Sequence, residues 1–161
     1  MSFDQKDKLV FTFILSVLDL LAVYYLPSYS LGFLLTSLGL FKLVGIRRSE
    51  FIPLAIAVAA LSTSQPYTIA FLALATAFAW VPYSYSFFIA LGVSVLTINL
   101  SSAFQFLSLL SLLIVMRYFN LEVRGFVVSG IALLIVAAVK LQFAGPLGDV
   151  AYFDLVMGVI G

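Results

Sequence analysis

Residues 51–116 read FIPLAIAVAALSTSQPYTIAFLALATAFAWVPYSYSFFIALGVSVLTINLSSAFQFLSLLSLLIVM and contain no Asp, Glu, Lys or Arg. A helix that crosses a lipid bilayer needs about 20 consecutive apolar residues, and somewhat fewer where the bilayer thins. This run is therefore long enough for three full membrane spans or for four short ones. It predicts that the chain is a helical membrane protein.

The rest of the chain is also apolar. Of its 161 residues, 64% are hydrophobic and 9% are charged, and the mean hydropathy is +1.22. A soluble domain carries about 25% charged residues, because much of its surface has to face water. Lipid is itself an apolar solvent. We therefore expect a multi-pass protein of the cell membrane, with lipid around most of its surface.

The apolar runs are predicted to be helices, because a spanning segment must satisfy its own backbone groups. Strands of a barrel would alternate apolar and polar residues, and runs such as 55–61 do not alternate. We expect an all-α polytopic bundle of about six to eight short transmembrane helices joined by very short loops. Breaks at Pro, Gly, Asn and Ser clusters place eight segments at about 9–26, 29–46, 51–63, 67–81, 85–98, 103–118, 124–143 and 149–161.

The basic residues predict the orientation of this bundle. If the chain has eight segments, its basic N-terminal end and two basic connections lie on the same side of the membrane. These parts carry Lys6, Lys8, Arg47, Arg48, Arg117 and Arg124. Loops on the cytoplasmic side of a membrane carry an excess of Lys and Arg, so the N-terminus is expected to be cytoplasmic. The N-terminal apolar run is interrupted by Asp19 and is expected to be a retained first helix rather than a cleaved signal.

We expect one transmembrane domain over residues 1–161. Similar Tyr-, Pro- and Ser-rich turns lie about 55 residues apart, at 25–30 and 80–86. They mark 8–62 and 66–118 as a candidate weak repeat of opposite orientation, followed by a C-terminal helical hairpin at 124–161. The competing explanation is that Pro, Ser and Tyr are common at membrane-interface turns.

Ionisable side chains inside apolar segments cost on the order of 2.5–3.5 kcal/mol to insert, so each one needs an explanation. Asp19 shares a face of the first segment with Thr12 and Ser16. Folding the first two segments about Pro27 places Asp19 level with Thr36, which we predict as a hydrogen-bond partner. We weigh an interhelical staple above a proton or cation site for Asp19.

Lys140 and Asp154 form a second candidate pair. They lie symmetrically about Leu147, the centre of a turn expected at residues 145–148. An antiparallel hairpin about that turn would place both at one depth and favours an ion pair between the last two segments. Snorkelling of both side chains to the membrane surface is the alternative.

A stripe of small polar residues on the sixth segment is the third candidate. Gln105, Ser108 and Ser111 share one face, and Ser94 and Thr97 could meet them from the fifth segment. The stripe is either the lining of a polar path or interhelical hydrogen bonding, which contributes about 0.6 kcal/mol per bond in membranes. We favour hydrogen bonding.

The composition excludes several kinds of chemistry. The chain has no Cys and no His, so no thiolate or histidine site for a metal, iron–sulfur cluster or haem is expected, and no cofactor is expected. It has no phosphate-binding loop and no nucleophile–base set, so we expect no catalytic residues and no enzyme. Its net charge of +1 implies no nucleic-acid partner.

The leading functional hypothesis is a non-catalytic integral membrane subunit of a larger complex, with a structural or accessory role and other membrane protein subunits as partners. A respiratory or energy-transducing complex is the expected class. The alternative is a small-solute or ion transporter, or a membrane substrate-binding component, that uses an intramembrane Asp. A membrane-embedded lipid-modifying enzyme is a third hypothesis, and the missing catalytic set argues against it.

Overall fold

The computed structural model describes residues 4–45, 84–139 and 144–161. This part of the chain has no strand, so the all-α class is confirmed for it. The expected segments at 51–63 and 67–81 lie outside the described residues, and so do 46–62 and 66–83 of the two halves of the candidate repeat. The six described helices are α1 (Gln5–Tyr25), α2 (Ser30–Val44), α5 (Ser84–Thr97), α6 (Ser102–Tyr118), α7 (Arg124–Val139) and α8 (Ala144–Ile160).

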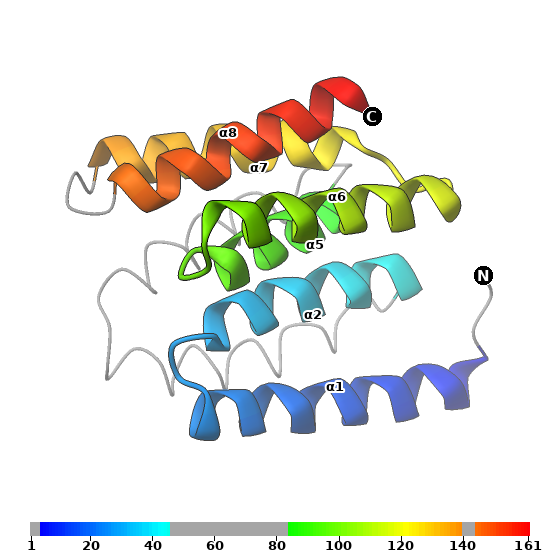
Figure 1. The fold of residues 1–161 in the computed structure, drawn as a ribbon. Helices are drawn as coiled ribbons and strands as arrows, with labels where there is room; N and C mark the ends of the chain where they lie inside the picture. Colours follow the sequence, from blue (N-terminus) through cyan, green and yellow to red (C-terminus); the bar gives the residue numbers. More distant parts are fainter. Residues whose placement is uncertain (1–3, 46–83, 140–143) are drawn as a thin grey trace.

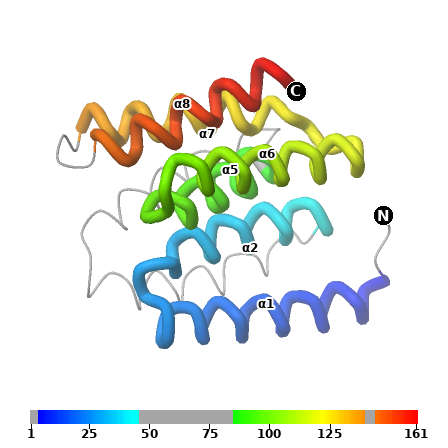
Figure 2. The backbone as a smooth tube through the Cα atoms, viewed as in Figure 1, coloured from blue at the N-terminus to red at the C-terminus, as the bar shows by residue number. Residues whose placement is uncertain are grey.

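The helices lie side by side with their axes roughly along one direction. Figure 1 shows α1 at one edge, α2 next to it, α5 and α6 in the middle, and α7 with α8 at the opposite edge. Helices joined by a short connection run antiparallel, and the two ends of the chain lie at the same end of the bundle, as the tube in Figure 2 shows. Short connections favour this packing of neighbours.

The first helix begins earlier than its apolar run. Asp4 is its N-cap, and the Asp4 side chain accepts a hydrogen bond of 2.9 Å from the backbone nitrogen of Gln5. This cap satisfies one of the free N–H groups at the helix start. The polar turn with Lys6 and Lys8 is therefore helical, and α1 starts at Gln5 instead of near residue 9.

The predicted turn at residues 145–148 is wrong, because α8 already begins at Ala144. Gly145 and Pro146 belong to the first helical turn, and Gly148 follows it. The first N–H groups of a helix have no partner within the helix, so Pro, which lacks this donor, is tolerated there. Pro and Gly thus mark the start of α8 and not the connection before it.

The core joins α2 with α5, α6, α7 and α8. Its members are apolar side chains with almost no exposed surface, and they include Leu35, Phe88, Leu91, Leu109, Met116, Phe126, Leu133, Val150 and Met157. Helix α1 contributes little to this core. Among its residues only Asp19 and Ala22 are buried, and its main contacts within the described part are made with α2.

Glycines allow three pairs of described helices to approach at backbone distance: α2 with α5, α5 with α7, and α7 with α8. A Cβ atom added at Gly92 of α5 would clash with the Thr36 hydroxyl oxygen and would lie 2.6 Å from the Thr36 nitrogen on α2. On α8, the corresponding contact is between Gly158 and Val127 of α7. Small residues at such contacts are typical of helices that pack by close van der Waals fit.

Helix lengths differ across the described residues. One helix, α1, with 21 residues, is long and apolar enough to cross a membrane by length and composition. The other apolar helices that the structure describes are shorter, with 14 to 17 residues. At 1.5 Å per residue they extend over about 21–26 Å.

Replacing Gly92 with Ala should loosen the contact between α2 and α5, because the added methyl group meets backbone atoms of α2 that cannot move aside. We expect the free energy of unfolding to fall by about 1–3 kcal/mol, the usual cost of overpacking. Denaturant unfolding of the purified chain, followed by circular dichroism, measures it. Gly148→Ala is the matched control, because no atom lies within 4 Å of its added Cβ. Equal losses in both variants would contradict this packing.

Candidate functional site

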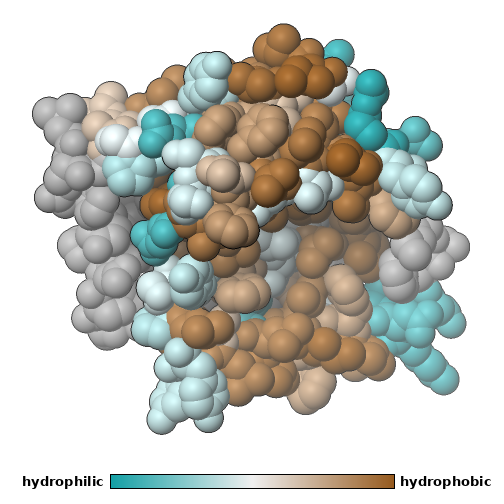
Figure 3. All heavy atoms as spheres, viewed as in Figure 1, coloured by the Kyte–Doolittle hydropathy of each residue, from teal (hydrophilic) through white to brown (hydrophobic). Residues whose placement is uncertain are grey.

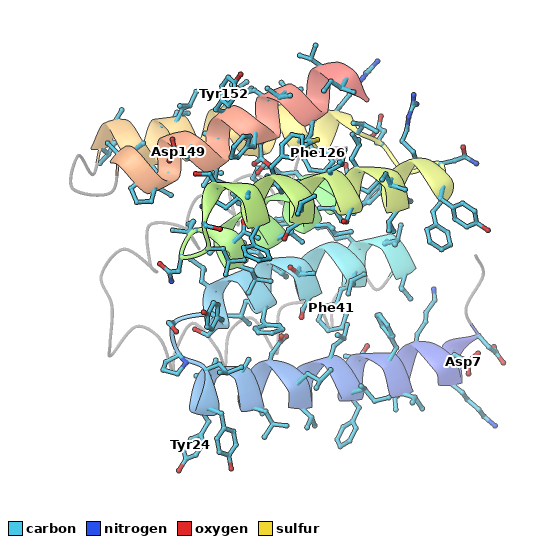
Figure 4. All side chains as sticks on the ribbon, in the orientation of Figure 1. Asp7, Tyr24, Phe41, Phe126, Asp149 and Tyr152 are labelled. Atoms are coloured by element: carbon cyan, nitrogen blue, oxygen red, sulfur yellow. The ribbon has the colours of Figure 1, made fainter. Side chains whose placement is uncertain are left out.

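Two carboxyl groups are enclosed in the described part of the chain. Asp154 lies on α8 with 0% of its surface exposed, and Asp19 lies on α1 with 3% exposed. The other described carboxylates lie near the ends of the helices, where Figure 4 labels Asp7 at one end and Asp149 at the other. A buried carboxyl needs hydrogen-bond partners, because losing its water is costly. The partners of these two groups define the candidate site.

Asp154 is held by serines from two other helices. The hydroxyl oxygen of Ser94, on α5, lies 2.9 Å from Oδ1 of Asp154 and 2.8 Å from Oδ2. The Ser129 hydroxyl, on α7, donates to Oδ2 at 2.8 Å. Both serines are fully buried. We call Asp154, Ser94 and Ser129 the carboxyl–serine cluster, and it joins α5, α7 and α8.

The position of the cluster follows from where α8 starts. The connection between α7 and α8 is centred between residues 141 and 142, and an antiparallel hairpin about that point places Asp154 opposite Ser129. The hairpin is therefore not centred on Leu147, and the argument from that centre for Lys140 as the partner of Asp154 no longer applies. Lys140 itself lies outside the described residues, so its ion pair with Asp154 stays a prediction.

Asp19 faces α2, as its position on the first hairpin suggests, but the predicted partner is wrong. The hydroxyl of Ser37 donates to Oδ1 of Asp19 at 2.7 Å. Thr36 donates to the carbonyl oxygen of Gly32 in its own helix, and its side chain lies against α5 at Gly92. One residue along a helix turns the side chain by about 100°, so Thr36 and Ser37 face different neighbours.

The polar stripe on α6 does not form one buried path. Gln105 is buried, Ser108 is half-buried and Ser111 is exposed. The Gln105 amide nitrogen donates to the carbonyl oxygens of Thr97 and Ile98, at 3.1 and 3.2 Å. These are carbonyls at the end of α5, which have no partner within that helix. Gln105 thus caps α5, while the Ser94 hydroxyl points to Asp154 instead of α6.

The carboxyl–serine cluster offers one acidic group and two hydroxyls. No group of three or more His, Cys, Asp or Glu side chains that could hold a metal ion occurs among the described residues. The arrangement can accept or hold a proton and can tie three helices together.

Sequence reasoning identified Asp154 but missed both serine partners. Ser129 stands alone in a run of apolar residues, and its position opposite Asp154 emerges only after Pro146 is assigned to the first turn of α8. For Ser94, the sequence predicts a contact with the polar stripe of α6 instead of with Asp154. Its true direction depends on the rotation of α5 about its axis, and a short polar pattern does not fix that rotation.

Removing one hydroxyl from the carboxyl–serine cluster should destabilise the bundle. In Ser94→Ala and in Ser129→Ala, a buried oxygen of Asp154 loses a hydrogen-bond partner. We expect each variant to lose about 1–3 kcal/mol of unfolding free energy. Ser111→Ala is the matched control, because that serine is exposed and bonds only within its own helix, so its change should stay within about 0.5 kcal/mol. A loss of unfolding free energy in Ser94→Ala that is no larger than the loss in Ser111→Ala would contradict the cluster.

The contact between Asp19 and Ser37 should appear as an energetic coupling. In a double-mutant cycle with Asp19→Asn and Ser37→Ala, we expect a coupling of about 0.5–3 kcal/mol in the unfolding free energy, because the two side chains touch. The same cycle with Thr36→Val in place of Ser37→Ala should be additive. Coupling to Thr36 and not to Ser37 would reverse the assignment.

Comparison with known proteins gives this chain no relative. No family model, curated protein or solved structure matches it. Its function therefore has to be inferred from its own contacts, burial and charge distribution.

Proposed function

We propose that the chain is a multi-pass protein of the cell membrane that serves as a non-catalytic subunit of a larger membrane protein complex. Its helices cross the bilayer, and its N-terminus is on the cytoplasmic side. The expected complex is a respiratory or energy-transducing assembly. Four features of the described residues support the proposal: an apolar outer surface, basic residues gathered at one end, small-residue helix contacts, and an open first helix.

The first support is the outer surface. Large apolar side chains are exposed on α1, α6, α7 and α8, and Phe13, Ile114 and Val139 have 62–73% of their surface uncovered. On the face seen in Figure 3, hydrophobic residues cover the middle of the bundle and hydrophilic residues gather toward the two ends of the helices. Such a large apolar patch is unusual on a soluble monomer and suits contact with lipid or with other membrane helices.

The second support is the distribution of charge. Gly32 of α2 lies against Leu96 of α5 and Gly39 lies against Ile89, so these helices are antiparallel and the end of α2 is beside the start of α5. Helices α1 and α2 are also antiparallel, and so are the consecutive helices from α5 to α8. All described basic residues therefore lie at one end of the bundle (Figure 1): Lys6, Lys8, Lys42, Arg117 and Arg124. Cytoplasmic ends of membrane helices carry this excess of Lys and Arg.

The short helices are compatible with this location. A typical hydrocarbon core is about 30 Å thick, and helices of about 21–26 Å are accommodated when the bilayer thins or flanking side chains reach outward. Lys42 in the last turn of α2 is such a flanking residue, and its ammonium group lies 5.4 Å from the ring centre of Phe88. The glycine contacts between α2 and α5 support close packing where lipid supplies no hydrophobic drive.

The observation that carries the subunit role is the position of α1. It contacts α2 in the described part, mainly through Asp19, Ala22 and the ring of Phe11 against Phe41, and most of its circumference is open. Large apolar residues project from it along its length, from Leu9 at 72% exposed to Tyr24, which Figure 4 shows pointing away from the bundle. Such a helix presents a surface for a helix of another subunit.

Transport of a small solute or ion is the second candidate function. The sequence pointed to Asp19 as its intramembrane carboxylate. The more enclosed carboxyl group is Asp154, which lies on α8 and forms hydrogen bonds with hydroxyl groups of α5 and α7. Buried ionisable groups of membrane proteins often mark ion or proton pathways. This observation favours Asp154 over Asp19 as the group a transporter would use.

Isolation of the tagged full-length chain in mild detergent tests the subunit proposal. We expect other membrane proteins, with redox or ATPase subunits among them, to co-purify in stoichiometric amounts. Leu9→Ala combined with Phe13→Ala should release them, because both side chains are exposed on α1. Ile131→Ala combined with Ile135→Ala on α7 is the matched control and should retain them. A stable lone monomer or homodimer would contradict the proposal and favour transport.

A further inference from the structure

The oxygen atoms of the carboxyl–serine cluster make more contacts at hydrogen-bond distance than the hydrogens of Ser94 and Ser129 can fill. The Ser94 hydroxyl oxygen lies 2.8 Å from the carbonyl oxygen of Ala90 and 2.8–2.9 Å from the two carboxyl oxygens of Asp154. All are hydrogen-bond distances. A serine hydroxyl carries one hydrogen, and an ionised carboxylate carries none. Only one of the two links of Ser94 can therefore use the hydrogen of Ser94.

A neutral carboxyl group completes the set. Asp154 then donates its own hydrogen to Ser94, Ser94 donates to the carbonyl of Ala90, and Ser129 donates to Oδ2 of Asp154. Counting the two contacts of Ser94 with the carboxyl group as one link, each of the three links then has one hydrogen. With an ionised Asp154, Ser94 must turn its hydrogen to the carboxylate, and its oxygen then faces the oxygen of Ala90 at 2.8 Å with nothing between them.

The surroundings also favour a neutral group. Helices α5, α6 and α7 pack against α8, and their described ionisable groups are Tyr85, Arg117, Tyr118 and Arg124. All four stand in end turns, and among the described residues Asp154 interacts with the two serines and with no cation. On α8 itself, Asp149 is exposed. A buried charge without an opposite charge is costly, so a proton is the simplest way to compensate it.

We propose that the carboxyl–serine cluster is a proton-binding site, in which Asp154 holds a proton and can release it while Ser94 and Ser129 stabilise both forms. In the ionised form, both serine hydroxyls turn to the carboxylate as donors. On protonation, Ser94 reverses its role and accepts the hydrogen of Asp154. The switch needs only rotation of one hydroxyl and no movement of a helix.

A proton fits this cluster better than a metal cation. Each serine oxygen lies 2.8–2.9 Å from a carboxyl oxygen of Asp154. This spacing leaves room for a hydrogen between the two atoms, and a metal ion would have to push them apart. Asp19 is the natural reference within the same chain. It is also buried, though less fully than Asp154, and among the described residues it has one hydroxyl partner, Ser37.

Infrared spectroscopy of the purified full-length chain in lipid vesicles tests the site, with aspartate carboxyl carbons labelled with ¹³C to identify the bands. We expect a C=O stretch of a protonated aspartic acid that is converted reversibly to a carboxylate band as the pH is raised. This stretch should be lost in Asp154→Asn and kept in Asp19→Asn. Ser129→Ala should shift it to higher frequency, because its carbonyl oxygen loses a donor.

The Ser129→Ala shift keeps the test decisive if Asp154→Asn does not fold. Absence of any protonated band over the whole pH range, or a band unaffected by both changes, would overturn the proposal. Sodium chloride added at constant pH should leave the band unchanged, and its loss on addition of sodium would assign the site to a metal cation instead. The measurement uses the isolated chain, so its outcome is independent of whether the chain has partner subunits.

Discussion

The structure depends on how an apolar bundle accommodates a carboxyl group in its interior. Asp154 has no exposed surface, so its oxygen atoms must be satisfied by neighbouring helices. Ser94 and Ser129 meet this need from α5 and α7, and this fixes how these helices are rotated against α8. An apolar core by itself specifies such rotations weakly, because apolar side chains fit in several ways. The same three side chains, Asp154, Ser94 and Ser129, form the proposed proton-binding site.

Close approach of the backbones is the second requirement, and glycine meets it. Between α2 and α5 the contact runs through Gly32, Gly39 and Gly92, and between α7 and α8 through Gly130 and Gly158. The contact between α7 and α8 brings the short hydroxyl of Ser129 within reach of Asp154. Packing and polar contacts therefore support each other. Helix α1 is outside this arrangement, and its open apolar surface is what favours a role within a larger assembly.

The sequence predicted the helical class and the positions of the six described helices to within a few residues, because Pro, Ser and charged residues interrupt the apolar runs. It also predicted that Asp19 faces α2. It failed where one residue decides the outcome. Pro146 was predicted to lie in a turn, although it belongs to the first turn of α8, and Ser129 was therefore missed as a partner of Asp154. Thr36 and Ser37 are adjacent, and their directions depend on the rotation of α2, which the strongly apolar sequence around them does not specify.

The central claim is that lipid surrounds this bundle, and washing of cell membranes with alkaline carbonate tests it most directly. This treatment releases proteins that are only attached to the membrane surface. The account predicts that the chain stays in the membrane pellet and is extracted only by detergent, because its exposed helix surfaces are apolar. Release into the wash as a monodisperse protein that needs neither detergent nor lipid would contradict it.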